Sequence, residues 1–273
     1  MTSIMPLVLV FAFIFGCVIG SFSNVVSLRF KTGKGLNGRS MCMSCGKTLT
    51  WKELVPVFSF AVQKGKCHGC KSKISWQYPL VELTTGLLFV LIASQSLKYA
   101  TISPAVIMIT LLYLISTCIL IVITIYDIKH KIIPDSLVYT FDMLALISVF
   151  IGGISIIHAP HLWTLLAGPI LALPFALLWL GSKGTWMGLG DAKLVLGIGW
   201  LLGLNGGANA VILAFWIGAV VSLLWMFATY RRFKSRLEIP FGPYLILGMY
   251  LVLLFGIQVL DVGILKALLV SYI

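Results

Sequence analysis

The hydrophobic positions of this chain gather into long, uninterrupted runs rather than into alternating or one-sided patterns. The first run, residues 1–28, contains no charged side chain. An α-helix of that length exceeds a hydrocarbon layer of about 30 Å, because each helical residue advances about 1.5 Å. Similar runs follow at 79–97, 104–126, 136–157, 162–180 and about 241–260. The pattern predicts an all-α polytopic membrane protein.

A charge-free segment at 194–230 is too long for one membrane span and short for two. It contains the run Gly203-Leu204-Asn205-Gly206-Gly207, and glycine and asparagine both favour turns. We therefore expect a short helix over about 191–204 and a full one over about 208–230. This division brings the predicted total to about eight transmembrane helices.

The basic residues test that total, because lysine and arginine concentrate at the cytoplasmic ends of membrane spans. With eight spans, eighteen of the twenty basic residues fall on one side, and only Lys98 and Lys266 lie opposite. A single span over 191–230 would instead place the 231–236 arginine cluster outside. The sequence thus predicts outer termini, a first helix at 1–28, a cytoplasmic loop at 29–78 and a seven-helix membrane domain at 79–273.

The composition agrees with a membrane protein and excludes several other classes. Hydrophobic residues make up 60% of the chain, charged residues 10%, and only eight residues are acidic. A soluble domain has about a quarter of its residues charged, and a disordered chain has few apolar ones. The net charge of +12 is juxtamembrane, so it predicts contact with anionic cytoplasmic headgroups and no nucleic-acid partner.

The 29–78 loop contains two CxxC pairs, which are typical of a tetrahedral zinc site. Four protein ligands leave no open coordination position, so such a zinc ion is structural. Gly46 and Gly69 are expected to supply the tight turns, and His68 is an alternative ligand. Two disulfides would be the other reading, which a reducing cytoplasm disfavours. The four predicted ligands are Cys42, Cys45, Cys67 and Cys70.

Two acidic residues at the edges of spans are candidates for chemistry. Asp127 ends the third span and Asp191 opens the sixth, and both are predicted at the same cytoplasmic depth. Two close carboxylates share a proton, so one can activate water while the other polarises a peptide carbonyl. Gly188 and Gly190 would let a substrate backbone approach the acid. Alternatively, Asp191 caps its helix.

The remaining ionisable residues have less defined expectations. Asp135 is predicted to cap the fourth span, and Asp142 to line a wet cavity or pair with a basic neighbour. Glu82, one turn into the second span, and Lys193, two residues after Asp191, are predicted to support the site. Asp261 lies near the outer edge, where solvent would surround it.

Five sequence elements together resemble those of the type IV prepilin peptidases. They are GSFSNVV at 20–26 followed by the CxxC pairs, YPLVEL at 78–83, Asp127 with Pro134-Asp135, GLGDAK at 188–193 and IPFGP at 239–243. Two small departures are Ser23 and Gln77, where the family often has an apolar residue and arginine.

The resemblance implies a bacterial plasma-membrane enzyme with Asp127 and Asp191 as the catalytic pair. It implies cleavage of a basic prepilin or pseudopilin leader after a glycine at the cytoplasmic face. Members with a full cysteine loop also methylate the new N-terminus with S-adenosylmethionine. No nucleotide-binding fingerprint in the sequence independently supports that second activity.

Two other readings remain at this point. A presenilin-like intramembrane protease also combines a Tyr-Asp helix with GxGD, but it lacks the cysteine loop and carries a Pro-Ala-Leu motif. A zinc-sensing, proton-coupled transporter would use membrane acids as proton relays. The sequence leaves open which prepilins are processed and the oligomeric state.

Overall fold

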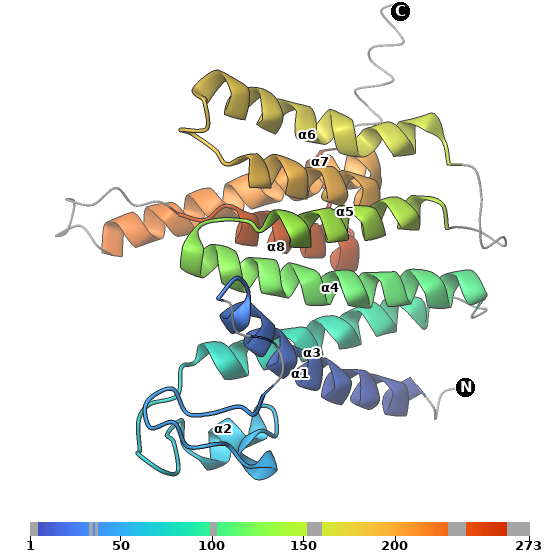
Figure 1. The fold of residues 1–273 in the computed structure, drawn as a ribbon. Helices are drawn as coiled ribbons and strands as arrows, with labels where there is room; N and C mark the ends of the chain where they lie inside the picture. The colour runs from blue at the N-terminus through green and yellow to red at the C-terminus, as the bar shows by residue number, and fades with distance from the viewer. Residues whose placement is uncertain are drawn as a thin grey trace, which may run out of the picture. The chain divides into compact units, whose positions relative to one another are not determined.

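A computed structural model describes residues 5–32, 35, 38–98, 103–151, 160–228 and 239–260, whose regular secondary structure is helical. Two isolated β-bridges, Met41 with Thr48 and Lys66 with Lys73, are the β-type pairings among them. The all-α fold is thus confirmed (Figure 1). In chain order the helices are α1 (Met5–Arg29), η1 (Trp51–Glu53), α2 (Phe58–Val62), α3 (Gln77–Ser96), α4 (Pro104–His130), α5 (Asp135–Val149), α6 (Leu162–Ser182), α7 (Leu189–Ala228) and α8 (Gly242–Phe255).

The chain divides into two compact units. The first contains the described residues of 1–102 together with 113–125, so it holds α1, the cysteine loop, α3 and the middle of α4. The second contains the described residues of 103–112 and 126–273, so it holds both ends of α4 and the helices α5 to α8.

Five of the described helices are long and apolar enough to cross a membrane: α1, α3, α4, α6 and α7. The helix α8 is apolar but shorter. The chain therefore has the helices of a multi-pass membrane protein, while the total of eight spans stays a prediction. Two helices end before the predicted spans do: α5 at Val149 rather than 157, and α8 at Phe255 rather than 260. The latter ends where Gly256 adopts a left-handed φ of 63°.

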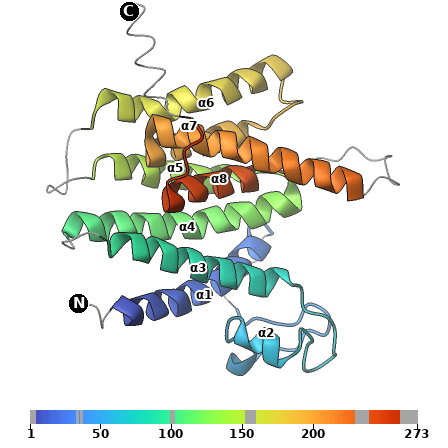
Figure 2. The same ribbon diagram turned by 180° about the vertical axis from the view of Figure 1, so that it is seen from behind.

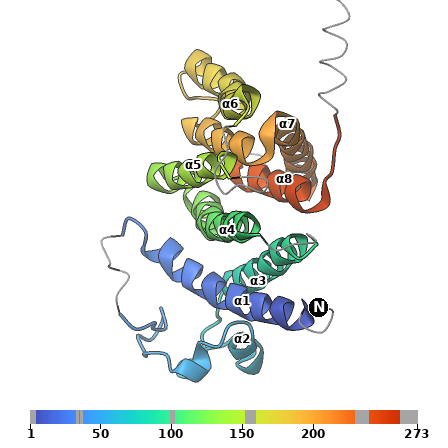
Figure 3. The same cartoon turned by 90° about the vertical axis from the view of Figure 1, so that its right-hand side faces the viewer.

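The break predicted within 203–207 is confirmed. Gly203 has φ 70° and ψ 179°, which divides α7 into two helices. A Cβ atom on Gly207 would lie 3.3 Å from the Cα of Gly199, although a straight helix would separate residues eight apart by about 12 Å. The chain therefore folds back at Gly203, and α7 packs beside both α6 and α8 (Figure 2, Figure 3).

In the first unit, α1 and α3 pack side by side through small residues (Figure 1). A Cβ on Gly16 would lie 2.8 Å from the Cα of Gly86, and one on Gly20 would lie 2.9 Å from the Cα of Glu82. Small residues at such contacts let two membrane helices approach closely. The free thiol of Cys17 fills this interface as a small buried side chain.

Candidate active site and metal centre

The four cysteines of the loop converge on one point. Their sulfur atoms all lie within 4.8 Å of one another, and the Sγ atoms of Cys42 and Cys70 are 3.8 Å apart. A tetrahedral zinc site with bonds of about 2.3 Å spaces its sulfurs about 3.8 Å apart. All four are free thiols rather than disulfides. The donor set therefore fits a tetrahedral metal ion, and His68 is not part of the cluster.

Each CxxC pair sits in a tight turn closed by backbone hydrogen bonds. The Cys42 N–H donates to the Lys47 carbonyl at 2.9 Å, and the Cys67 N–H donates to the Ser72 carbonyl at 2.9 Å. The residue after the second cysteine has a left-handed φ in both turns, 70° at Gly46 and 60° at Lys71. Gly69 lies in the second turn as expected, although the left-handed position there belongs to Lys71. Gly69 instead lies against Lys47 and the Cys45 sulfur.

The environment of the loop favours thiolate at Cys42. Backbone N–H groups of Cys45 and Ser44 lower the pKa of the Cys42 thiol to about 6. The hydroxyl of Ser72 lowers the pKa of Cys70. Because a thiolate is the form that ligates a metal, both shifts suit metal binding. Hydrogen bonds with the Cys70 and Cys42 sulfurs act the other way at Cys45 and raise its pKa to about 11.

An ion pair links the first cysteine turn to η1. The Lys47 ammonium lies 3.0 Å from Glu53 Oε1, and Glu53 Oε2 accepts hydrogen bonds from the N–H and hydroxyl of Thr50, each at 2.9 Å. The Thr50 backbone N–H and the Lys47 ammonium lower the pKa of Glu53 to about 2. These contacts hold η1 beside the cysteine cluster.

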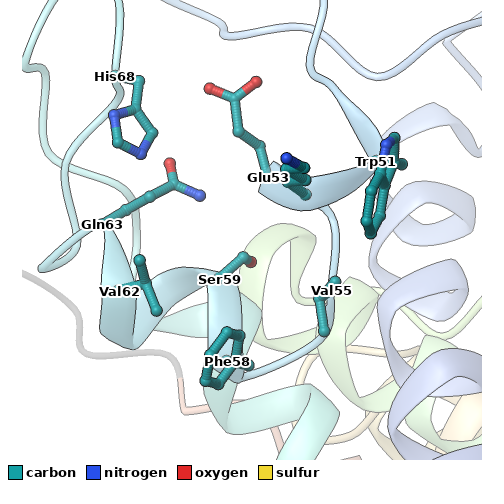
Figure 4. Close-up of a pocket in the computed structure, with 9 residues that line it drawn as sticks. Trp51, Glu53, Val55, Phe58, Ser59, Val62, Gln63 and His68 are labelled. Atoms are coloured by element: carbon teal, nitrogen blue, oxygen red, sulfur yellow. The ribbon is translucent and has the colours of Figure 1, made fainter.

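A hollow of about 400 Å³ lies between η1 and α2. Figure 4 shows Glu53, Gln63 and His68 along one edge and Val55, Phe58 and Val62 along another. His68 therefore lines this hollow rather than ligating the metal.

Glu82 connects the loop to the membrane helices of its own unit. Glu82 is 7% exposed, and its carboxylate accepts the backbone N–H of Val57 at 2.7 Å. Val57 has φ 62°, a conformation that β-branched residues rarely adopt. The Ser21 side chain of α1 also bonds this carboxylate. Glu82 thus ties α1, α3 and the strained turn before α2 together.

In the second unit, Asp127 and Asp191 lie within electrostatic range of each other. Asp127 lies in the last turn of α4 and is 4% exposed, and Asp191 lies in the first turn of α7. Their carboxyl groups interact electrostatically, and the Asp191 carboxyl also bonds the backbone N–H of Gly188. Asp191 is the third residue of α7, so it is not the N-cap residue. Its carboxyl group instead bonds the backbone N–H of Gly188, the residue before the helix, as the acid of a capping box does. Capping and the encounter with Asp127 therefore coexist.

Glycines determine how closely the surrounding chain approaches this pair. A Cβ on Gly242 would lie 2.7 Å from Asp127 Oδ2, and one on Gly190 would lie 2.8 Å from the Cβ of Ile133. Ile133 also faces Gly242, at 3.2 Å from its Cβ position. Ile133 thus packs between the glycine before Asp191 and the glycine beside Asp127. Gly188 is less crowded, with a Cβ position 3.7 Å from Asp191 Oδ2.

Gly242 is the site residue that the sequence reasoning missed. Its signal was present in the IPFGP element, which was read as a family feature without a role. The backbone N–H of Gly242 faces the Asp127 carboxyl group, while Oδ2 of Asp127 has no hydrogen-bond partner among the described residues. Oδ2 of Asp127 therefore lies beside Gly242 without a hydrogen bond.

Comparison with known proteins assigns the family. A model of the bacterial peptidase A24 N-terminal domain matches residues 14–96, and the type IV leader peptidase family model matches residues 114–223. A prepilin leader peptidase/N-methyltransferase of Bacillus subtilis is 31% identical over 260 residues, which are 94% of this chain and 98% of the relative. The chain belongs to the type IV leader peptidase family.

Other members of this family give similar matches. A prepilin leader peptidase/N-methyltransferase of Myxococcus xanthus is 30% identical over 245 residues, covering 87% of this chain and 70% of the relative. One of Neisseria gonorrhoeae is 28% identical over 273 residues, covering 90% of each. No solved structure matches this chain. The four cysteines lie within the range matched by the N-terminal domain model, 14–96. Both aspartates lie within the range matched by the leader peptidase model, 114–223.

Lys193, Asp135 and Asp142 lie on α5 and α7. Lys193 bonds Asp135 at 2.6 Å and lies 4.7 Å over the Tyr139 ring. The cap predicted for Asp135 was wrong, because Pro134 holds the N-cap position and Asp135 pairs with Lys193 instead. Asp142 is 5% exposed against Gly197. Asp261 lies outside the described residues.

Proposed function

We propose that this chain is a membrane aspartic endopeptidase that removes the basic leader of type IV prepilins or pseudopilins after a glycine. The observation that carries the proposal is the meeting of Asp127 and Asp191, brought together from the end of one helix and the start of another. Family membership supports a peptidase over a zinc-sensing transporter, and it favours a prepilin peptidase over a presenilin-like protease.

The two carboxyl groups divide the acid and base work. Like charges at close range favour a state in which the pair holds one proton. The ionised carboxylate takes a proton from water, and the water oxygen attacks the carbonyl carbon of the scissile peptide. The protonated carboxyl gives its proton to the carbonyl oxygen. Collapse of the tetrahedral intermediate breaks the C–N bond, and a proton passes from the pair to the departing nitrogen.

The position of the pair suits a substrate with a basic leader and an apolar stalk. Asp127 closes the apolar helix α4, and Asp191 opens the apolar α7. Ends of membrane helices lie at the interface, which is where such a substrate passes from water to lipid. The positive-inside bias of the chain supports a cytoplasmic position for this interface, with anionic headgroups beside it.

A second activity, N-methylation of the new N-terminus, follows from the names of the relatives, which are prepilin leader peptidase/N-methyltransferases. S-adenosylmethionine is the methyl donor in this proposal. Zn²⁺ is the metal of the cysteine cluster, held by Cys42, Cys45, Cys67 and Cys70. With four thiolates the ion supplies structure rather than an open coordination site. The cysteine loop at 29–78 is then a folded element between the helix at 1–28 and the membrane domain at 79–273.

One experiment tests both activities. Purified protein in detergent is incubated with a prepilin and S-adenosylmethionine, and the products are weighed by mass spectrometry. Wild type should release the leader and add one methyl group to the new N-terminus. Asp127→Asn and Asp191→Asn should each abolish leader release, while the matched Asp261→Asn change should not. Normal cleavage by either dyad variant would refute the assignment.

A further inference from the structure

Asp142 is a buried acidic residue that the proposed mechanism does not use. It lies in the middle of α5 and is 5% exposed. The backbone N–H of Gly197 faces its carboxyl group, but neither carboxyl oxygen has a hydrogen-bond partner among the described residues. Burying a carboxylate without a partner is costly. A carboxylate at this position therefore depends on a positive charge nearby.

The Lys193 ammonium is the positive charge that acts on Asp142. It bonds Asp135 at 2.6 Å, lies 4.7 Å over the Tyr139 ring and attracts the Asp142 carboxylate. Those three residues are spaced i, i+4 and i+7, so they follow one face of α5. The Asp135 side chain is 65% exposed, and exposed ion pairs contribute little to stability. Asp142, which is buried, therefore depends on the lysine more than Asp135 does.

One face of α7 packs on α5 and on the segment just before it. Gly190, Lys193 and Gly197 are spaced i, i+3 and i+7, so they share this face. A Cβ on Gly190 would lie 2.8 Å from the Cβ of Ile133, and a Cβ on Gly197 would collide with the Asp142 carboxyl group. Lys193 lies between these two contacts. Its attraction to Asp142 therefore acts on the same face that fixes how α7 lies on α5.

The rotation of α7 about its own axis decides where Asp191 points. Successive helical residues turn by about 100°, because 3.6 residues complete one turn. Asp191 precedes Lys193 by two residues, so the two side chains lie about 160° apart around the helix. A rotation that turns Lys193 toward α5 thus turns Asp191 to the opposite side, and Asp191 interacts there with Asp127.

We propose that Asp142 is a positioning residue of the peptidase site: its carboxylate holds Lys193 toward α5 and thereby keeps Asp191 turned toward Asp127. The inference rests on the proposed function, in which Asp191 is one of the two catalytic acids. Asp142 acts through Lys193 and takes no part in the reaction itself. Its negative charge is what matters, so a neutral side chain of the same shape does not replace it.

Thermal unfolding of the purified protein in detergent tests the electrostatic link. Lys193→Met removes the ammonium but keeps an unbranched side chain, so it leaves the Asp142 carboxylate buried without its cation. The melting temperature should fall by about 5 °C or more, because removing one partner of a buried charge pair is strongly destabilising. Adding Asp142→Asn to Lys193→Met should restore most of that loss. Adding Asp135→Asn instead should restore none of it, since water solvates the exposed carboxylate.

Kinetics on one prepilin peptide test the positioning role. Asp142→Asn keeps the shape of the side chain, and Lys193 keeps its bond to Asp135, so the melting temperature should equal that of wild type. The variant should lower kcat and kcat/KM equally, by about tenfold or more, because a misdirected acid slows the chemical step without weakening substrate binding. Asp135→Asn is the matched control and should lower kcat much less.

Each measurement has an outcome that overturns the inference. If Asp142→Asn does not restore the melting temperature of Lys193→Met, Asp142 is not the partner of the lysine. An unchanged kcat in Asp142→Asn, or a larger loss in Asp135→Asn, would show that Asp142 does not position Asp191. Failure of wild type to cut the peptide refutes the proposed function itself, whereas the restored melting temperature would still establish the charge pair.

Discussion

Oδ2 of Asp127 lies against Gly242 so closely that a Cβ atom at position 242 would be 2.7 Å away. Real Cβ atoms do not approach an oxygen this closely, so position 242 admits only glycine without a shift of the carboxyl group or of α8. Phe241, one residue earlier, lines a hollow of about 230 Å³ between α7 and α8. The start of α8 therefore positions both the acid and its neighbouring surface.

Gly242→Ala should lower prepilin cleavage strongly, by about 100-fold or more, because displacing a reacting group by about 1 Å can cost that much. Gly181→Ala is the comparison, since its Cβ position in α6 has nothing within 4 Å. Its loss should be markedly smaller. Initial rates on one prepilin peptide measure both variants, and equal losses would contradict the steric explanation.

Glu82→Ala should loosen the cysteine loop. It removes the acceptor of the Val57 N–H, and an unsatisfied buried donor costs about 1–3 kcal/mol. Val57 would also be freer to leave its left-handed conformation. Faster proteolysis within residues 51–63 and weaker zinc retention are the expected results.

Glu82→Gln is the matched control, because its amide oxygen still accepts that hydrogen bond. It should protect the loop nearly as well as wild type does. If the glutamine and alanine variants were digested at the same rate, the hydrogen bond to Val57 would not be what holds the loop.

Metal analysis should find one zinc ion per chain. Cys45→Ser or Cys70→Ser should lower that content and the thermal stability together, because each removes one of four ligands. Cys118→Ser, a cysteine outside the cluster, should keep the full zinc content. Removing the zinc by chelation without any change in thermal unfolding would contradict a structural metal.

Gly203→Ala should destabilise the protein by about 1–3 kcal/mol, because φ 70° with ψ 179° is a region open almost only to glycine. The matched change Gly181→Ala lies in α6 with nothing within 4 Å of its Cβ position. It should be neutral or stabilise the helix, since alanine is favoured over glycine there by about 0.5–1 kcal/mol. Thermal unfolding in detergent compares the two, and equal melting temperatures would contradict a strained turn at Gly203.

Several site features were predictable because they depend on local pattern or on depth. The CxxC spacing by itself placed Cys42, Cys45, Cys67 and Cys70 together, since a short knuckle fixes its own geometry. The lysine and arginine distribution predicts Asp127 and Asp191 on one side of the membrane, and this topology stays a prediction. The glycine-rich run at 203–207 located the break in α7. Each of these follows from residues close in sequence or from the position of a residue along a helix axis.

The tertiary structure decided which residues lie side by side at a given depth. Hydropathy fixes how far a residue lies along the membrane normal, but a helix with apolar side chains all round gives no signal of its rotation. For that reason the sequence alone did not place Gly242 on Asp127, Ile133 between two glycines or Val57 on Glu82. The sequence by itself determined the helices, the cysteine cluster and the two acids. Only the packing of helices against one another decided which residues neighbour these groups. Two residues touch only if they lie at the same depth and if the rotation of each helix turns them toward each other.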